Sequence, residues 1–305
     1  MFNRPDTTAR VFEAIRLARP PRLYVAADGP RASRAGERDR CEAVRRIATA
    51  VDWPCELVTL FREQNLGCKR AVSSAISWFF EHEAEGIVLE DDCLPDPTFF
   101  GYCDELLERY RDESRVMCIS GDNFISDTWK PQESYYFSKF VHIWGWASWR
   151  RAWQLYDVDM QDWQSRDKRA MLEQLMPGQR RAQAHWRACF DGVAGGTIDT
   201  WDYQWVYACW QHGGVSAMPA VNLVSNIGFG QDATHTVSPE SKLATLPVEA
   251  LRVPMHHSPR IEPNQWADAW TGLHVLGIDE RRLSPTRLRE ALSRRLRRVW
   301  QAAMS

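Results

Sequence analysis

The sequence lacks a long apolar run, a charge excess and a glycosylation acceptor. No window approaches the roughly 18 apolar residues that cross a bilayer, and the N-terminus has no apolar core like that of a signal peptide. Lys and Arg total 38 against 40 Asp and Glu, so net charge does not attract the chain to nucleic acid. No Asn-x-Ser/Thr site occurs. We therefore predict a cytoplasmic protein that binds no nucleic acid.

The cysteines also lack a pattern. No Cys-x-x-Cys pair occurs and most cysteines have apolar neighbours, which argues against a zinc site and against a disulfide scaffold and favours a reducing compartment. The eight are Cys41, Cys55, Cys68, Cys93, Cys103, Cys118, Cys189 and Cys209.

The first part of the chain alternates helices and strands. With 305 residues the chain can form one large domain or two closely joined ones. Alternating elements imply right-handed βαβ crossovers and a mostly parallel sheet over about the first 120 residues. Periodicity predicts helices over 6–18, 37–50, 69–82 and 97–110, and strands over 23–26, 56–61, 86–90 and 115–119.

After Asn123 the pattern changes to short aromatic and polar segments. We expect three parts, 1–124, 125–250 and 251–305, with a mobile loop over 222–247. Most of the 15 tryptophans should fill the core, which leaves some rings to stack on a ligand. Helices are predicted near 147–156, 168–190 and 201–211.

The C-terminal segment is strongly basic. Residues 281–298 contain eight arginines, and leucines recur at helical spacing beside them. The simplest interpretation is an amphipathic helix packed on the body of the protein. A second is peripheral contact of residues 281–300 with the anionic inner membrane.

Three consecutive acids close the predicted strand over 86–90. Glu90, Asp91 and Asp92 would lie at the carboxyl end of a parallel sheet, where ligands bind. In an extended chain Glu90 and Asp92 would point one way and Asp91 the other. Hard oxygen ligands suit Mg²⁺ or Mn²⁺, which proteins usually hold with one or two carboxylates plus substrate phosphates. The simpler alternative is an acidic turn in solvent.

Asp28 ends another predicted strand, ahead of Gly29, and should lie on the same sheet edge. Its carboxylate could accept hydrogen bonds from a base or a ribose, although Asp-Gly is also a common turn. Lys69 and Arg70 could add positive charge near a diphosphate, and the alternative is that both are solvated.

Six blocks along the chain form an ordered set: FNRPDTTARVFEAIR, YVAADGPR, NLGCKRAVSSAISWFF, GIVLEDDCLPDPTFFGYC, GWASWRRAW and WDYQW. The set resembles the blocks of GT-A glycosyltransferases in the same order and is most similar to N-acetylglucosaminyltransferase I and its bacterial relatives. The resemblance covers about residues 3–236.

The resemblance implies a GT-A, Rossmann-like α/β fold with a mostly parallel sheet flanked by helices and an aromatic-rich acceptor lobe. Residues 1–124 would then bind the nucleotide-sugar, and 125–250 would bind the acceptor. Glu90-Asp91-Asp92 matches the family's metal and nucleotide-sugar motif, in which Asp92 binds the divalent ion. Asp28 matches the acid that contacts uridine, and Arg4 matches a basic residue near the base.

Asp202 resembles the family's catalytic base, although two residues rather than one separate it from the next Trp, which leaves Asp199 as a second candidate. From the residues alone, Asp202 or Thr200 could instead cap a helix. The segment 225–236 matches a lid over the donor, where His235 would complete the metal shell or touch phosphates. His256 and His257 are weaker candidates.

The family's first strand precedes the FNRPD-like turn, whereas here only Met1 and Phe2 do so. Either the chain starts inside a longer gene product or this edge of the sheet is completed differently.

These observations predict an inverting glycosyltransferase that uses Mn²⁺ or Mg²⁺, a nucleotide-diphosphate sugar, expected to be a UDP-sugar, and a bacterial glycan or lipid-linked glycan. The alternatives are a nucleotidyltransferase that forms sugar nucleotides and a glycan-binding module without catalysis.

Overall fold

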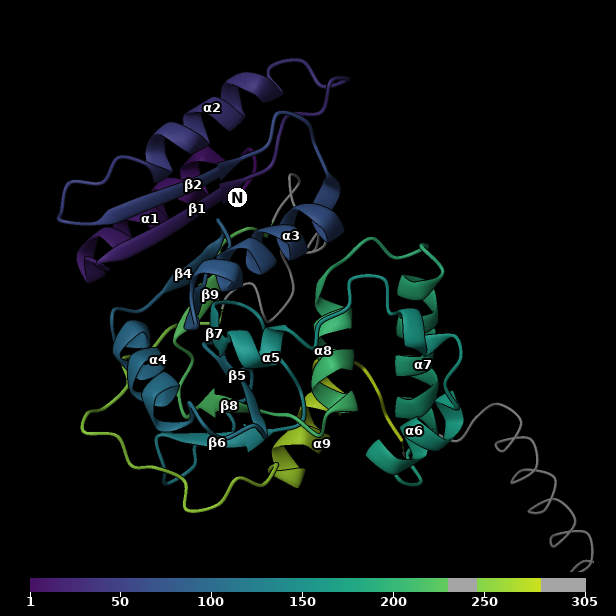
Figure 1. Ribbon diagram of the computed structural model, residues 1–305. Coiled ribbons are helices and arrows are strands. Elements are labelled where there is room, and N and C mark those ends of the chain that lie inside the picture. The colour runs from purple at the N-terminus through teal and green to yellow at the C-terminus, as the bar shows by residue number, and fades with distance from the viewer. Residues whose placement is uncertain (230–245, 281–305) are drawn as a thin grey trace, which may run out of the picture.

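A computed structural model describes residues 1–229 and 246–280 (Figure 1). No helix in these two ranges is long and apolar enough to cross a membrane. In chain order the elements are α1 (Pro5–Ala18), β1 (Arg22–Ala27), α2 (Glu37–Ala48), β2 (Glu56–Phe61), α3 (Gly67–His82), β3 (Glu85–Val88), β4 (Cys93–Pro95), α4 (Thr98–Arg109), β5 (Val116–Ser120), β6 (Tyr135–Ser138), β7 (Trp146–Trp149), α5 (Arg150–Trp153), the 3-10 helix η1 (Gln161–Trp163), α6 (Lys168–Leu175), α7 (Arg180–Ala194), α8 (Asp202–Gln211), β8 (Val215–Pro219), β9 (Val224–Asn226) and α9 (Gln265–His274).

The strands form three sheets. The largest has five strands in the order β3-β7-β5-β8-β6 and is mixed, because only β5 and β8 run parallel. β1 and β2 form a separate parallel pair, and β4 and β9 form a short antiparallel pair. The fold is therefore mixed α/β, and the expectation of a mostly parallel sheet was wrong.

β7 explains much of this difference. The sequence predicted a helix over 147–156, but residues 146–149 form a strand between β3 and β5, and the helix covers only Arg150–Trp153. Successive side chains of a strand point to opposite faces. Accordingly, Trp146 packs in one hydrophobic cluster and Trp149 in another.

The other predicted elements differ in how well they match. The four predicted strands correspond to β1, β2, β3 and β5, and the four helices before residue 120 correspond to α1 to α4, within a few residues. The helix predicted over 168–190 is two helices, because the chain turns at Pro177-Gly178, where Gly178 has a φ of 73°. β9 lies inside the expected loop 222–247. Residues 230–245 and the basic segment 281–300 lie outside the described residues.

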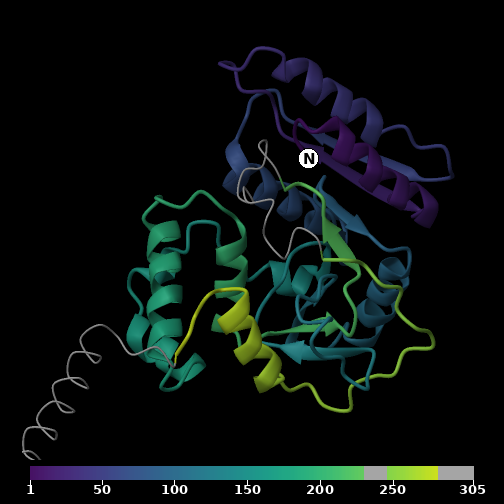
Figure 2. The same cartoon turned by 180° about the vertical axis from the view of Figure 1, so that it is seen from behind.

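The helices cover the sheets in separate groups. In both views β1, β2, α1 and α2 lie together above the five-stranded sheet, and α6, α7 and α8 pack side by side next to it (Figures 1 and 2). β3 and β5 come from residues 1–124, whereas β6, β7 and β8 come from 125–250, so both ranges contribute to one sheet. The proposed division into parts at 124 and 250 stays a prediction.

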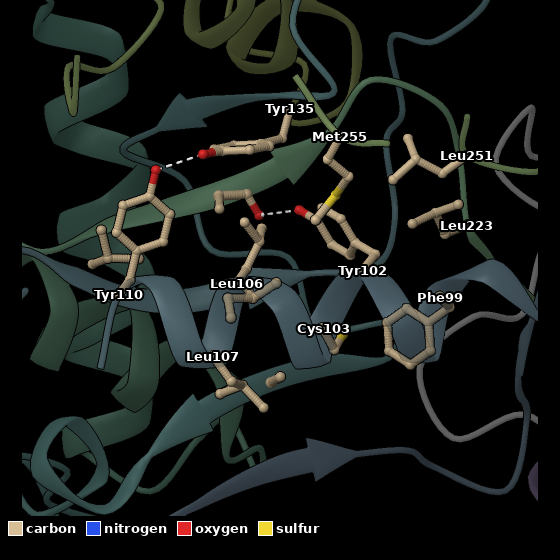
Figure 3. Close-up of a cluster of buried hydrophobic side chains, with 14 of the residues drawn as sticks. Phe99, Tyr102, Cys103, Leu106, Leu107, Tyr110, Tyr135, Leu223, Leu251 and Met255 are labelled. Atoms are coloured by element: carbon tan, nitrogen blue, oxygen red, sulfur yellow. Dashed lines mark hydrogen bonds between the residues drawn. The ribbon is translucent and has the colours of Figure 1, made fainter. Parts of the chain in front are cut away.

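One face of α4 forms the core beside the five-stranded sheet. Its buried side chains recur at helical spacing and contact β5, β6 and β8 (Figure 3). The Tyr102 hydroxyl donates to the Ala217 carbonyl at 3.2 Å, and the hydroxyls of Tyr110 and Tyr135 are 2.5 Å apart. These bonds satisfy buried polar atoms that would otherwise destabilise the core.

Tryptophans join β7 to α5 and α8. The ring centroid of Trp146 lies 5.9 Å from that of Trp153, 5.8 Å from that of Trp201 and 5.7 Å from that of Trp205, and all four side chains are buried. These rings fill the core and leave no face for a ligand. Of the four tryptophans between residues 144 and 153, only Trp144 is partly exposed.

We expect Trp146→Ala to lower the free energy of unfolding by about 3–5 kcal/mol, since it empties the centre of this aromatic core. Trp146→Phe should cost much less, because the Trp146 Nε1 has no hydrogen-bond partner to lose. Trp266→Ala is the control, because Trp266 is 49% exposed. Urea unfolding measures all three variants, and equal losses for Trp146→Ala and Trp266→Ala would contradict the expectation.

Candidate functional site

The three consecutive acids lie in a tight turn between β3 and β4. The Cys93 N–H closes the turn by donating to the Glu90 carbonyl at 3.1 Å. The Ile227 N–H donates to the Asp92 carbonyl at 2.8 Å, so the segment after β9 lies against the turn. A Cβ on Gly228 would overlap the Asp92 carboxylate. The acids are therefore covered by backbone, which differs from the alternative of an acidic turn in solvent.

Arg4 forms ion pairs with two of the acids. Its Nη2 lies 2.5 Å from Asp91 Oδ1, and its Nη1 lies 2.9 Å from Asp92 Oδ2. The Phe2 N–H also donates to Asp91 Oδ2 at 3.0 Å. Burial of the guanidinium lowers its pKa, but the two carboxylates outweigh burial and raise the pKa of Arg4 above its ordinary value.

This arrangement corrects the expected directions of the acids. An extended chain would have pointed Asp91 and Asp92 to opposite sides, but both residues lie in the turn and converge on Arg4. The order of the acids along the chain was therefore a poor guide to which of them act together.

Glu90 has a different environment from its neighbours. Burial, followed by the charges of Asp92 and Asp91, raises the pKa of Glu90 to about 8. Burial also raises the pKa of Asp92, against the opposing effect of Arg4. This environment favours the protonated form of Glu90, which can donate a hydrogen bond.

Asp28 directly follows β1, and its carboxylate binds the turn that follows β2. Its carboxylate accepts hydrogen bonds from the Gly29 N–H at 2.8 Å, Asn65 Nδ2 at 2.9 Å and the Leu66 N–H at 2.9 Å. These contacts join the ends of the two parallel strands. The structure thus gives Asp28 a positioning role, and contact with a nucleotide stays a prediction.

Asp202 is the first residue of α8. Thr200 Oγ1 donates to its Oδ1, and Trp201 is buried beside it. The residue before the helix is Trp201, and no side chain caps the helix. The alternative that Asp202 or Thr200 caps α8 was therefore wrong.

Two further acids, Asp199 before α8 and Asp202 at its start, lie near the beginning of α3. Cys68, near the start of α3, lies within electrostatic range of Glu90, Asp202 and Asp199. Burial, followed by these three charges, raises the pKa of Cys68 to about 12. Both candidate bases thus lie on the side of the molecule where β3 ends.

The predicted cations are paired elsewhere. Lys69 Nζ lies 3.6 Å from Asp159 Oδ1, and Arg70 Nη2 lies 2.7 Å from the same atom. At the acidic turn, positive charge comes instead from Arg4, which pairs with Asp91 and Asp92, and from the N-terminal ammonium, whose charge lowers the pKa of Glu90 against the effect of burial.

The predicted histidines give no site in the described chain. His235 lies outside the described residues. His257 contacts Glu105 Oε1 at 3.0 Å and the Tyr135 hydroxyl at 3.2 Å, and the His256 N–H donates to Ser134. These contacts are made with α4 and with residues at the start of β6. They agree with the ranking of His256 and His257 as weaker candidates for a ligand site.

Sequence reasoning missed a buried pair, Asp122 and His142. Asp122 is fully buried, and His142 Nδ1 lies 3.3 Å from its Oδ2. Neither carboxylate oxygen has a hydrogen-bond partner among residues 1–229 and 246–280. The His142 ring stacks on Phe124, and the Asp122 charge helps to raise the pKa of Cys93, after burial and the charges of two acids of the turn. The available sequence signal was the position of Asp122 just after the strand predicted over 115–119.

The carboxylates of the acidic turn can be compared with the ligands that a divalent ion needs. Asp91 and Asp92 converge on one cationic group, and two carboxylates plus substrate phosphates are a usual magnesium set. As placed, however, their oxygens bind Arg4, and no group of three potential ligands occurs within 1–229 and 246–280. Asp91 and Asp92 would therefore fit a divalent ion in ligand type and ligand number once the ion pair between Arg4 and Asp92 opens.

Comparison with protein-family models and with curated proteins found no match to this chain.

Glu90 should make the stability depend on pH. Its pKa is raised in the folded state, so folding stability is greatest below the unfolded-state pKa near 4.5 and falls as the pH rises toward 8. We expect Glu90→Gln to be roughly 4 kcal/mol more stable than wild type at pH 8.5 and only about 1 kcal/mol more stable at pH 5. Urea unfolding with EDTA present measures this difference. A difference that does not change with pH would contradict the assignment.

Arg4→Met should leave two buried carboxylates without an ion-pair partner and lower stability at pH 7.5 by about 3 kcal/mol. Mn²⁺ should then restore part of the melting temperature, because it replaces the lost positive charge. The control is Arg16→Met, which removes only exposed ion pairs and should barely change the melting temperature. Thermal melting with and without Mn²⁺ tests both points. No response of Arg4→Met to Mn²⁺ would show that these acids do not hold a divalent ion.

Proposed function

We propose that the chain is an inverting, metal-dependent glycosyltransferase of the GT-A class. The donor is a nucleotide-diphosphate sugar, namely a UDP-sugar, and the acceptor is a hydroxyl of a bacterial glycan or lipid-linked glycan. We further propose that it works in the cytoplasm, at the inner membrane if residues 281–300 bind anionic lipid. The observation that carries the proposal is that separate elements place acids on one side of the molecule. The turn after β3 carries Glu90, Asp91 and Asp92, and α8 begins with Asp202.

Asp202 is the proposed general base. Inverting transfer forms a bond from the acceptor oxygen to the anomeric carbon while the bond from that carbon to the diphosphate breaks. The acceptor proton passes to the Asp202 carboxylate, and the diphosphate leaves with the bonding electrons. The Thr200 hydroxyl donates to Oδ1, and Asp202 follows the buried Trp201 at the start of α8.

The leaving diphosphate needs compensating positive charge. Arg4 is positioned to supply it, because its guanidinium already lies between Asp91 and Asp92. A divalent ion at Asp92 would supply Lewis-acid stabilisation of the same group when bound. Glu90, whose protonated form is favoured by burial and by the charges of Asp92 and Asp91, can donate a hydrogen bond to a donor hydroxyl or phosphate.

Calorimetry with UDP, other nucleoside diphosphates and triphosphates, with and without Mn²⁺, tests the proposal together with donor hydrolysis. We expect nucleoside-diphosphate binding that requires Mn²⁺. Asp202→Asn should retain this binding and lose at least about 100-fold in turnover, because only the base is removed. Asp199→Asn is the matched control for a neighbouring acid and should retain most turnover. Asp92→Asn should lose the Mn²⁺ dependence of binding.

Other outcomes would reject the proposal. Triphosphate binding with pyrophosphate release would identify a nucleotidyltransferase, and glycan binding without nucleotide affinity would identify a non-catalytic module. If Asp199→Asn rather than Asp202→Asn abolishes turnover, the base assignment was wrong and the transferase assignment stands.

A further inference from the structure

The strands β3 and β5 end at the same edge of the five-stranded sheet. Val88 of β3 and Ser120 of β5 both pair with Trp146, the first residue of β7, which lies between them. The two strand ends are therefore two strand spacings, about 10 Å, apart. Ligands of α/β proteins bind beyond the carboxyl ends of strands. The residues that follow β5 thus share a ligand-binding edge with the acidic turn that follows β3.

Asp122, two residues beyond β5, has a fixed backbone and an unpaired carboxylate. The Gly121 N–H before it donates to the Gly145 carbonyl at 2.7 Å, and the Asn123 N–H after it donates to Asn222 Oδ1 at 3.0 Å. The side chain is fully buried, yet within 1–229 and 246–280 neither of its oxygens has a hydrogen-bond partner. A buried carboxylate is costly without a donor, so its retention here needs a reason.

His142 is placed to be the partner of Asp122. Its Nδ1 lies 3.3 Å from Asp122 Oδ2, and the Ser120 hydroxyl donates to its carbonyl at 2.7 Å. The contact between the two side chains is close but not aligned as a hydrogen bond. Such contacts often tighten when a ligand binds. Nδ1 is buried while 10% of the His142 side chain is exposed, so the exposed part lies away from the carboxylate.

Three aromatic side chains, Phe124, Trp144 and Phe229, form a wall beside the imidazole. The His142 ring stacks on Phe124, with centroids 4.5 Å apart and planes inclined by 28°. Trp144 lies edge-on to Phe124 at 5.0 Å and to Phe229 at 5.8 Å. All three side chains of this aromatic wall are partly exposed. Aromatic rings with a few polar groups among them are the usual lining of a ligand site.

The residues around His142 reach both parts of the candidate site. Trp144 contacts Phe229, in the segment after β9 that covers the acidic turn. Ile143 packs in the hydrophobic cluster that contains Trp201, the residue just before α8. A ligand at His142 would therefore lie near the acids of the turn and near the candidate base at the start of α8.

We propose that His142, oriented by Asp122, binds a hydroxyl of a pyranose ring that stacks on the aromatic wall. Asp122 holds a proton on Nδ1 and leaves Nε2 for the hydroxyl. A pyranose combines apolar faces with hydroxyls at its edge, so one ring satisfies both kinds of contact. The buried carboxylate repels phosphate, which favours the neutral part of a substrate. This inference rests on the proposed function, in which a pyranose comes from either the donor or the acceptor.

The binding test uses the 305-residue chain and the methyl pyranosides of glucose, galactose, mannose and N-acetylglucosamine, with and without UDP and Mn²⁺. Saturation-transfer NMR detects contact between the sugar and the protein. The test variant is His142→Asn, whose amide can still donate to Asp122 but has no group at the position of Nε2. His274→Asn is the matched control, because His274 stacks in the same way on Trp270, with centroids 4.4 Å apart, on α9. Thermal melting checks that both variants fold.

We expect saturable binding of at least one pyranoside. His142→Asn should weaken it by at least about tenfold, since a hydrogen bond to the ring is lost, and His274→Asn should leave it unchanged. Nitrogen-15 NMR of the histidine rings should show a proton on His142 Nδ1, and the pyranoside should shift the Nε2 resonance. The resonances of His142 are those that disappear in His142→Asn.

Activity distinguishes the two sources of the sugar. If the pyranose is the acceptor, His142→Asn should slow transfer to the pyranoside by at least about tenfold and retain hydrolysis of the UDP-sugar. If it is the sugar of the donor, both rates should fall while UDP binding is retained. If the wild type binds no UDP, the proposed function fails, and pyranoside binding alone decides the present inference.

Three results would overturn the proposal. If no pyranoside binds the wild type saturably under any of these conditions, the aromatic wall is not a sugar site. If wild type and His142→Asn bind equally, His142 does not hold the ring. If the His142 ring carries its proton on Nε2 alone, Asp122 does not orient it.

Discussion

The double ion pair of Arg4 is the contact that holds the candidate site together. Arg4 precedes α1, whereas Asp91 and Asp92 follow β3, so the pair joins the N-terminal segment to the turn between β3 and β4. Asp91 is almost fully buried, with 4% of its side chain exposed, and a buried carboxylate is costly without a partner. The N-terminal segment and the acidic turn therefore stabilise each other.

The same contact connects charge to chemistry. Arg4 provides positive charge where two carboxylates converge, while burial and the charges of Asp92 and Asp91 raise the pKa of Glu90 next to them. The three adjacent acids thus suit two roles, ion pairing for Asp91 and Asp92 and hydrogen-bond donation for Glu90. In the proposed transferase, binding of a diphosphate would redistribute these charges, since its phosphates would compete with Asp91 and Asp92 for Arg4.

Local sequence patterns were sufficient to predict the helices and strands in the first half of the chain. They were insufficient to predict how the strands pair. β1, β2, β3 and β5 could be predicted because branched apolar runs end at turn residues. Their arrangement could not, because β7 enters between β3 and β5 from a distant aromatic segment whose spacing also suits a helix. Four-residue strands buried on both faces, such as β6 and β7, carry no alternation to distinguish them from helix.

The site was predictable in location more than in detail. The rule that ligands bind beyond strand ends identified Asp28 and the acidic turn. The rule says nothing of partners, so it missed that Arg4 pairs with two of the acids. It also did not show that Lys69 pairs with Asp159, or that Asp122 is buried against His142. These contacts join residues far apart in sequence, and only the packed chain brings them together.

The segment from Met1 to Arg4 links the end of β1 to the acidic turn. The Met1 N–H₃⁺ donates to the Ala26 carbonyl in β1, and the Phe2 N–H donates to Asp91 after β3. Only Asn3 separates Phe2 from Arg4, so the contacts that fix Met1 and Phe2 also fix where the Arg4 guanidinium lies between Asp91 and Asp92. Because a buried carboxylate needs a partner, the position of this short segment determines how the two acids are neutralised before any ligand binds.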